Sequence, residues 1–161
     1  MLEKKNFYIN GSWVSPKKPR DIKVINPATE KACAVISIAS KDDVNDAVLS
    51  AKEAFKSWGF STKEERISLI ETFYTLYKSR WNDITDAIIQ EMGAPKDFAS
   101  KLQTGTGASH TKSFIRYLKE FEFEKPLGEH AKNQRLIYEP KGVCALITPW
   151  NWPMNQVTLK V

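Results

Sequence analysis

The chain has 161 residues, of which 42% are hydrophobic and 27% are charged, a balance typical of a globular protein with a buried core. Its longest apolar runs, such as Val143–Ile147, are far shorter than the roughly 20 residues of a membrane helix, and the N-terminus lacks the apolar segment of a signal peptide. We therefore expect a cytoplasmic protein that does not bind membranes. The net charge of +5 is distributed among alternating lysines and glutamates, so we expect no binding of nucleic acid.

The first forty residues have the pattern of short strands joined by turns. Asn10-Gly11 separates Phe7–Ile9 from Trp13-Val14, and this dipeptide between two apolar runs is a strong signal for a hairpin. Two later runs, Ile22–Ile25 and Ala34–Ala39, predict further strands. The chain therefore opens with β-structure.

At Ser40 the spacing of apolar residues changes from that of strands to that of a helix. Ser40 and Asp43 have the form of a capping box at the start of this helix. Gly59 follows the last apolar residue of the pattern and is expected to end it.

A second capping box, Thr62 with Glu65, opens a longer helical region that is expected to run to Gly93. Residues 96–119 give a third helical region with a weaker apolar pattern.

The stretch Thr104–Ala108, TGTGA, is similar to the start of a dinucleotide-binding loop. However, His110 stands where a third glycine would be, and no strand precedes the stretch. We interpret its small residues as places where a helix packs closely against a neighbour.

Residues 121–140 return to alternation on either side of Pro126–Gly128 and predict a β-hairpin or a pair of edge strands. Val143–Ile147 does not alternate, which is typical of a strand covered on both faces in a parallel sheet. We expect it to be the first strand of such a sheet.

The turn after this run carries the candidate site. Thr148 and Trp152 each precede a proline and are expected to be extended, so Trp150-Asn151 would make the turn and Pro153 would begin a helix. Ligands of open α/β sheets bind beyond the carboxyl ends of the strands, where a tryptophan offers a flat apolar wall and an asparagine two uncharged donors. The residues alone also allow a plain turn asparagine and core tryptophans.

Two cysteines, Cys33 and Cys144, do not make a disulfide framework, and neither has a Cys or His at metal-ligand spacing. Both lie in apolar, strand-like stretches, so we expect each to be buried as a small hydrophobic residue. His110 and His130 are isolated, and no metal site is predicted.

An ordered series of short motifs runs through almost the whole chain. They are Tyr8–Val14 (YINGSWV), Val24–Glu30 (VINPATE), Ala54–Trp58 (AFKSW), Glu91–Gly93 (EMG) and Pro140–Pro153, which ends in PWNWP. In this order they resemble the N-terminal portion of the NAD(P)-dependent aldehyde dehydrogenase superfamily. The ordered set, with PWNWP in it, is far more specific than any one short motif.

The resemblance implies an oxidoreductase in which a cysteine thiolate attacks the aldehyde, the thiohemiacetal gives hydride to NAD or NADP, and a glutamate activates water to release the carboxylic acid. It implies that Asn151 donates its amide to the oxyanion, and that Lys160 lies near the active site. Glu91 matches a position that helps to hold a monovalent cation. The positions that it implies along the cofactor are Ile147, Thr148, Pro149, Trp150 and Asn151.

The implied fold is α/β: N-terminal strands, helices and then the first strand of a Rossmann-like parallel sheet, truncated. Residues 1–120 would begin the cofactor-binding domain, residues 121–140 would form the hairpin of an oligomerisation element, and residues 141–161 would be the first strand-turn-helix unit. A homodimer or homotetramer is expected of the complete enzyme. Family members supply the nucleophile and general base beyond the point that matches Val161, so we predict that this chain alone is inactive and prone to associate. An alternative is a non-catalytic partner of full-length subunits.

Overall fold

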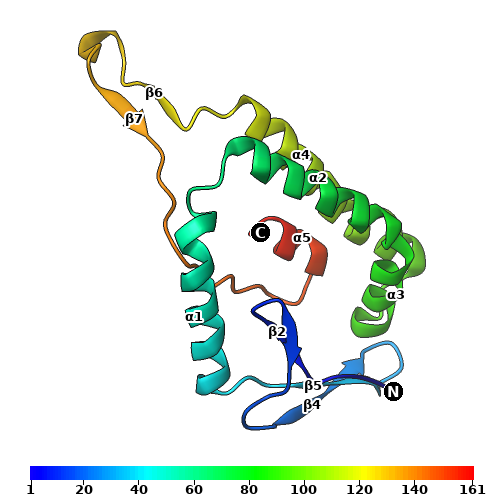
Figure 1. The fold of residues 1–161 in the computed structure, drawn as a ribbon. Helices are drawn as coiled ribbons and strands as arrows, with labels where there is room; N and C mark the ends of the chain where they lie inside the picture. The colour runs from blue at the N-terminus through cyan, green and yellow to red at the C-terminus, as the bar shows by residue number, and fades with distance from the viewer.

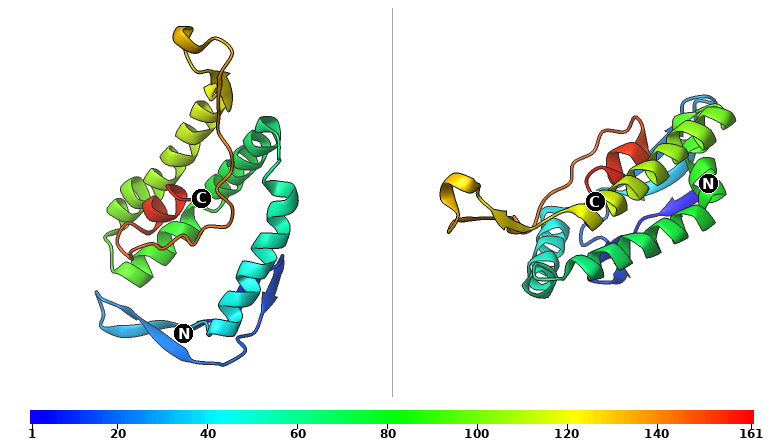
Figure 2. Two further views of the ribbon diagram at one scale, coloured as in Figure 1. Left: turned by 90° about the vertical axis from the view of Figure 1, so that its left-hand side faces the viewer. Right: turned by 90° about the horizontal axis from the view of Figure 1, so that it is seen from above.

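The structure, a computed structural model, describes residues 1–161. The β-strands β1–β5 lie at one end of the molecule, and the hairpin β6–β7 projects from the opposite end (Figures 1 and 2). The elements in chain order are β1 (Leu2–Lys4), β2 (Phe7–Ile9), β3 (Ser12–Val14), β4 (Asp21–Asn26), β5 (Lys31–Ser37), α1 (Lys41–Trp58), α2 (Lys63–Ser79), α3 (Trp81–Met92), the π-helix η1 (Phe98–Thr104), α4 (Gly105–Glu120), β6 (Glu124–Pro126), the 3₁₀-helix η2 (Glu129–Ala131), β7 (Arg135–Ile137) and α5 (Pro153–Thr158).

The N-terminal strands form two small sheets. The predicted hairpin β2–β3 is confirmed, and its turn residues Asn10 (φ 51°) and Gly11 (φ 74°) both have the left-handed backbone that such a turn requires. The second sheet has the order β1-β5-β4, in which β4 and β5 are antiparallel and β1 runs parallel to β5. The strand β1 was missed in the sequence because it has only three residues and no apolar alternation.

Both predicted capping boxes are present. The backbone N–H of Asp43 donates to the Ser40 hydroxyl, and Glu65 forms the same reciprocal arrangement with Thr62. The carboxylate of Asp43 also accepts the backbone N–H of Lys17 at 2.9 Å, which ties the loop after β3 to the start of α1. The first turn of α1 is therefore fixed to the β-structure.

The region predicted as one long helix is two helices. The helix α2 ends at Ser79 and α3 begins at Trp81, with Arg80 between them outside the helical backbone range (φ −103°, ψ 19°). The break allows the Trp81 indole N–H to donate to the Ser100 hydroxyl at 3.0 Å. Gly93 ends α3 as predicted, in the left-handed conformation (φ 65°).

The third helical region begins as a π-helix, η1, and continues as α4. Gly107 lies on the buried face of α4, where an added Cβ would overlap the Tyr77 hydroxyl and lie 3.0 Å from the Met154 Cβ. The TGTGA stretch is thus a close-packing site inside helices, in agreement with our interpretation.

The hairpin expected within residues 121–140 is present as the antiparallel pair β6–β7, with η2 between the strands. An aromatic cluster lies at its base, where Phe121 contacts Phe123 at 4.9 Å and Tyr138 at 5.1 Å between ring centroids. The Arg66 guanidinium stacks over Phe123 and connects this base to α2. A role in oligomerisation stays a prediction.

The strand expected at Val143–Ile147 is not formed. This segment is an extended chain without a pairing strand, and Ile147 is 84% exposed. Cys144, expected to be buried, is exposed with it, whereas Cys33 is half-buried in β5. Such an apolar run is typical of a strand that has neighbouring strands and is covered on both faces, and within residues 1–161 no strand pairs with this segment.

None of the helices combines the length and the apolar character that crossing a bilayer requires.

Candidate active site

The turn between the extended segment and α5 has an unusual backbone. Pro153 occupies the first turn of α5, as expected. Trp152 is not extended, because its backbone is left-handed (φ 59°, ψ 57°), a rare conformation for a bulky residue. The chain therefore reverses into α5 at Trp152 itself, directly after Asn151.

A cavity of about 480 Å³ lies beside this turn. Thr148, Pro149 and Trp150 line one side of it, and Val157 of α5 is close to them. The other side comes from β4 and from the end of α3, where Glu91 reaches the same cavity. Three of the five residues assigned to the cofactor, and the candidate cation-binding glutamate, are thus brought together.

Other candidate residues lie outside this cavity. Asn151 and Lys160 are exposed, and the Lys160 ammonium donates to the Gln156 side chain at 3.1 Å. Ile147 is on the exposed extended segment before the cavity. Their proposed roles stay predictions.

Two contacts that the sequence did not indicate hold the turn and α5 in place. The Phe98 ring packs edge-to-face on Trp152, with centroids 5.4 Å apart and planes at 69°. Farther along α5, His110 Nε2 and Asn155 Oδ1 are 2.8 Å apart. Phe98 is 54 positions from Trp152 in sequence and His110 is 45 from Asn155, so no local pattern could have found either pair.

The helices beneath this region are joined by buried polar groups. The Tyr77 hydroxyl donates to the Thr104 carbonyl at 2.8 Å, and burial raises the pKa of Tyr77 to about 12. The hydroxyls of Thr85 and Thr104 are 3.0 Å apart. These bonds hold α2 and α3 against the junction of η1 and α4. Phe98 lies on η1 and His110 lies on α4.

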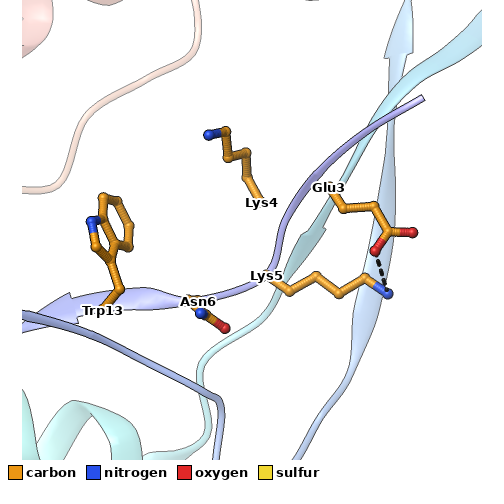
Figure 3. Close-up of a pocket in the computed structure, with 5 residues that line it drawn as sticks. All are labelled: Glu3, Lys4, Lys5, Asn6 and Trp13. Atoms are coloured by element: carbon orange, nitrogen blue, oxygen red, sulfur yellow. Dashed lines mark ion pairs between the residues drawn. The ribbon is translucent and has the colours of Figure 1, made fainter.

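A second cavity, of about 660 Å³, lies near the N-terminus and is drawn in Figure 3. The Lys5 ammonium is already paired there, at 2.9 Å with Asp21 and 3.5 Å with Glu3, and the Asp21 hydrogen bond is the main cause of its raised pKa. Lys4, Asn6 and Trp13 complete the lining. None of the candidate catalytic or cofactor residues lines this cavity.

No group of three His, Cys, Asp or Glu side chains is arranged to hold a metal ion.

Comparison with known proteins identifies the family. The sequence model of the aldehyde dehydrogenase family matches residues 13–161. The chain belongs to the aldehyde dehydrogenase family. It is 42% identical over 162 residues to a 3-succinoylsemialdehyde-pyridine dehydrogenase from Pseudomonas, with 100% of this chain and 33% of that protein covered.

Solved aldehyde dehydrogenases have the same fold in this region. An enzyme from Bartonella henselae is 48% identical with a TM-score of 0.96, and the match covers 99% of this chain and 33% of that one. A mutant aldehyde dehydrogenase C from Pseudomonas syringae, in complex with NAD+ and octanal, is 38% identical with a TM-score of 0.90, over 96% of this chain and 31% of that one. The predicted fold, the N-terminal part of an aldehyde dehydrogenase, is confirmed. The chain spans about a third of the length of these relatives.

Proposed function

We propose that residues 1–161 are the N-terminal part of an enzyme that oxidises an aldehyde to a carboxylic acid with NAD or NADP. In the overall reaction, the aldehyde, water and the oxidised cofactor give the acid, the reduced cofactor and a proton. The observation that carries the proposal is the PWNWP turn. The chain belongs to this family, and its PWNWP turn carries an exposed Asn151. Asn151 lies between Trp150, which lines the cavity, and the start of α5.

Asn151 is proposed to stabilise the oxyanion that forms when the aldehyde carbon becomes tetrahedral. Its side-chain amide donates hydrogen bonds without a charge, so it can favour developing negative charge without repelling a cationic nicotinamide ring. Its position directly before the tethered residue Trp152 keeps the amide on a fixed backbone. Lys160, one helix later, is proposed to lie near the same site.

The cavity beside Trp150 fits part of a dinucleotide. Its volume of about 480 Å³ is in the usual range for small-molecule sites, and its lining combines apolar side chains with two polar residues, Thr148 and Glu91. Thr148, Pro149 and Trp150 would hold the cofactor there, which when bound accepts the hydride. Support comes from relatives solved with NAD+ and, for a glyceraldehyde-3-phosphate dehydrogenase from Bacillus halodurans (28% identical, TM-score 0.85), with NADP.

Neither cysteine of the chain is proposed as the nucleophile. Cys33 Sγ is directed at the Val24 carbonyl at 3.4 Å inside the β4–β5 pair, and Cys144 lies on the exposed extended segment. Neither lines the cavity beside Trp150. We therefore propose that residues outside 1–161 supply the nucleophile and the general base.

The hairpin β6–β7 is proposed to reach a second subunit, giving a homodimer or homotetramer. It projects away from the helices (Figure 2), and at its base Arg66 over Phe123 and a hydrogen bond from the Lys63 ammonium to the Phe121 carbonyl hold it to α2. The same hairpin could join full-length subunits if this chain acted as a non-catalytic partner. Co-purification with an intact dehydrogenase, without a gain in its activity, would distinguish that alternative.

A chimeric enzyme tests the proposed reaction. Residues 1–161 replace the matching third of the Bartonella henselae aldehyde dehydrogenase, and cofactor reduction is followed with a panel of aldehydes. The chimera is expected to turn over, and Asn151→Ala is expected to lower its kcat by about 10²–10³-fold. Asn45→Ala, which removes an exposed amide on α1, is the matched control. A folded chimera without activity on any aldehyde, or with the same kcat after Asn151→Ala, refutes the proposal.

A further inference from the structure

The position of Asn151 depends on contacts from other parts of the chain. The helix that follows it, α5, has six residues, and an isolated helix of that length does not hold its shape in water. The segment before Asn151 is extended and unpaired. The turn must therefore be fixed by tertiary contacts of its own residues.

Trp152 is the residue of the turn under backbone strain. Its left-handed conformation is unfavourable for a large side chain, and such strain persists only when surrounding contacts compensate for it. The Trp152 carbonyl accepts the N–H of Gln156 at 3.0 Å, so this same residue also closes the first turn of α5. Any relaxation at Trp152 would rotate the peptide that joins it to Asn151.

The compensating contact is with Phe98. The two half-buried rings meet edge-to-face, a geometry that adds to the free energy of apolar burial. Phe98 begins the π-helix η1, and helices of this type occur frequently at functional sites. Ala99 and Thr104 within η1 are fully buried, so Phe98 is presented from a firmly packed element.

The second tether acts at a different place. His110 contacts Asn155, which lies one turn inside α5, and so it holds the body of the helix. Phe98 instead contacts the residue at which the chain reverses. We infer that Phe98, acting through Trp152, is a positioning residue that sets the amide of Asn151 for catalysis, an inference that rests on the proposed function.

The test uses the chimeric enzyme and separates positioning from general stability. Phe98→Leu removes the ring and keeps an apolar side chain. It is expected to lower kcat about tenfold, because the Asn151 amide would be displaced, and a catalytic donor displaced by less than an ångström loses much of its effect. The KM for the cofactor is expected to stay within about twofold, since the cavity residues are unchanged. Phe98→Tyr keeps the ring and should retain kcat. Phe55→Leu, the same change at a half-buried ring on α1, is the matched control.

A double-mutant comparison gives the decisive readout. If Phe98 acts through Asn151, Phe98→Leu has no further effect on kcat in an Asn151→Ala background. Trp152→Leu removes the other ring of the pair, and its effect on kcat should likewise disappear in the Asn151→Ala background. This variant replaces Phe98→Leu in the test if Phe98→Leu fails to fold. An unchanged kcat for Phe98→Leu, or an equal loss with and without Asn151, overturns the inference. By contrast, an Asn151→Ala chimera with full kcat refutes the proposed function itself.

Discussion

Replacing Gly107 by alanine is expected to destabilise the helical layer, although alanine is normally the better helix former. The added methyl group would lie 2.9 Å from Tyr77 Cζ and 3.0 Å from the Met154 Cβ, and would overlap the Tyr77 hydroxyl. Relief requires movement of Tyr77, which is buried, and a smaller shift of Met154 on α5. Movement of Tyr77 strains its buried hydrogen bond to the Thr104 carbonyl.

The size of the effect follows from these contacts. Overpacking a filled core costs about 1–3 kcal/mol, and displacing the Tyr77 hydroxyl from the Thr104 carbonyl adds about 1 kcal/mol. The helix propensity of alanine offsets up to about 1 kcal/mol of this loss. The net decrease in the free energy of unfolding is therefore about 1–3 kcal/mol.

Gly105→Ala is the matched control, two residues away on the same helix. Its nearest neighbours would be the Ser100 carbonyl and Trp81, both at 3.9 Å, an ordinary van der Waals distance. This variant should be neutral or more stable by up to about 1 kcal/mol. Urea unfolding of the two variants of the 161-residue polypeptide, followed by circular dichroism, gives the comparison.

The reasoning also predicts a partial rescue. Tyr77→Phe removes the hydroxyl that the new methyl group would overlap, so it should cost less in the Gly107→Ala background than in the original sequence. A Gly107→Ala variant at least as stable as Gly105→Ala would refute the close-packing argument.

The 161-residue polypeptide alone is expected to show no aldehyde-dependent reduction of NAD or NADP, because neither of its cysteines lies at the candidate cavity; turnover above that of a heat-inactivated sample would contradict this expectation. Its stability should fall in acid partly through Asp43. Hydrogen bonds from the Ser40 hydroxyl and the Lys17 backbone N–H hold the pKa of this carboxyl below its ordinary value. The stabilisation is present above the unfolded pKa of about 3.9 and is lost as the pH falls through the lower folded value. Asp43→Asn should therefore lose less stability than the original chain below about pH 4 in urea titrations, and parallel pH curves would contradict the assignment.

The features predicted from sequence are those with local causes. The capping boxes at Ser40 and Thr62 and the Asn10-Gly11 hairpin each depend on residues within a few positions of one another, and all are present. The break at Arg80 and the π-helix η1 were missed, because packing between distant segments determines them.

The candidate site divides in the same way. Thr148, Pro149 and Trp150, which the motif assigns to the cofactor, line one cavity, and their contact with a cofactor stays a prediction. The motif could not give the backbone of Trp152, since the general preference of residues before proline is overridden by a contact with a distant ring. Nor could it give the pairing state of Val143–Ile147, which depends on what lies beside it.

The order of strands in the first sheet has a consequence for synthesis of the chain. The strand β1 lies beside β5 and not beside the strands that follow it, so Leu2 pairs with Ala34. On the ribosome, β1 has no partner until β5 has been translated, whereas β4 and β5 are joined by a short turn between Asn26 and Lys31 and can pair as soon as both emerge. The sheet is therefore expected to assemble with its local hairpin first, and the N-terminus, although synthesised earliest, should be the last strand to join it.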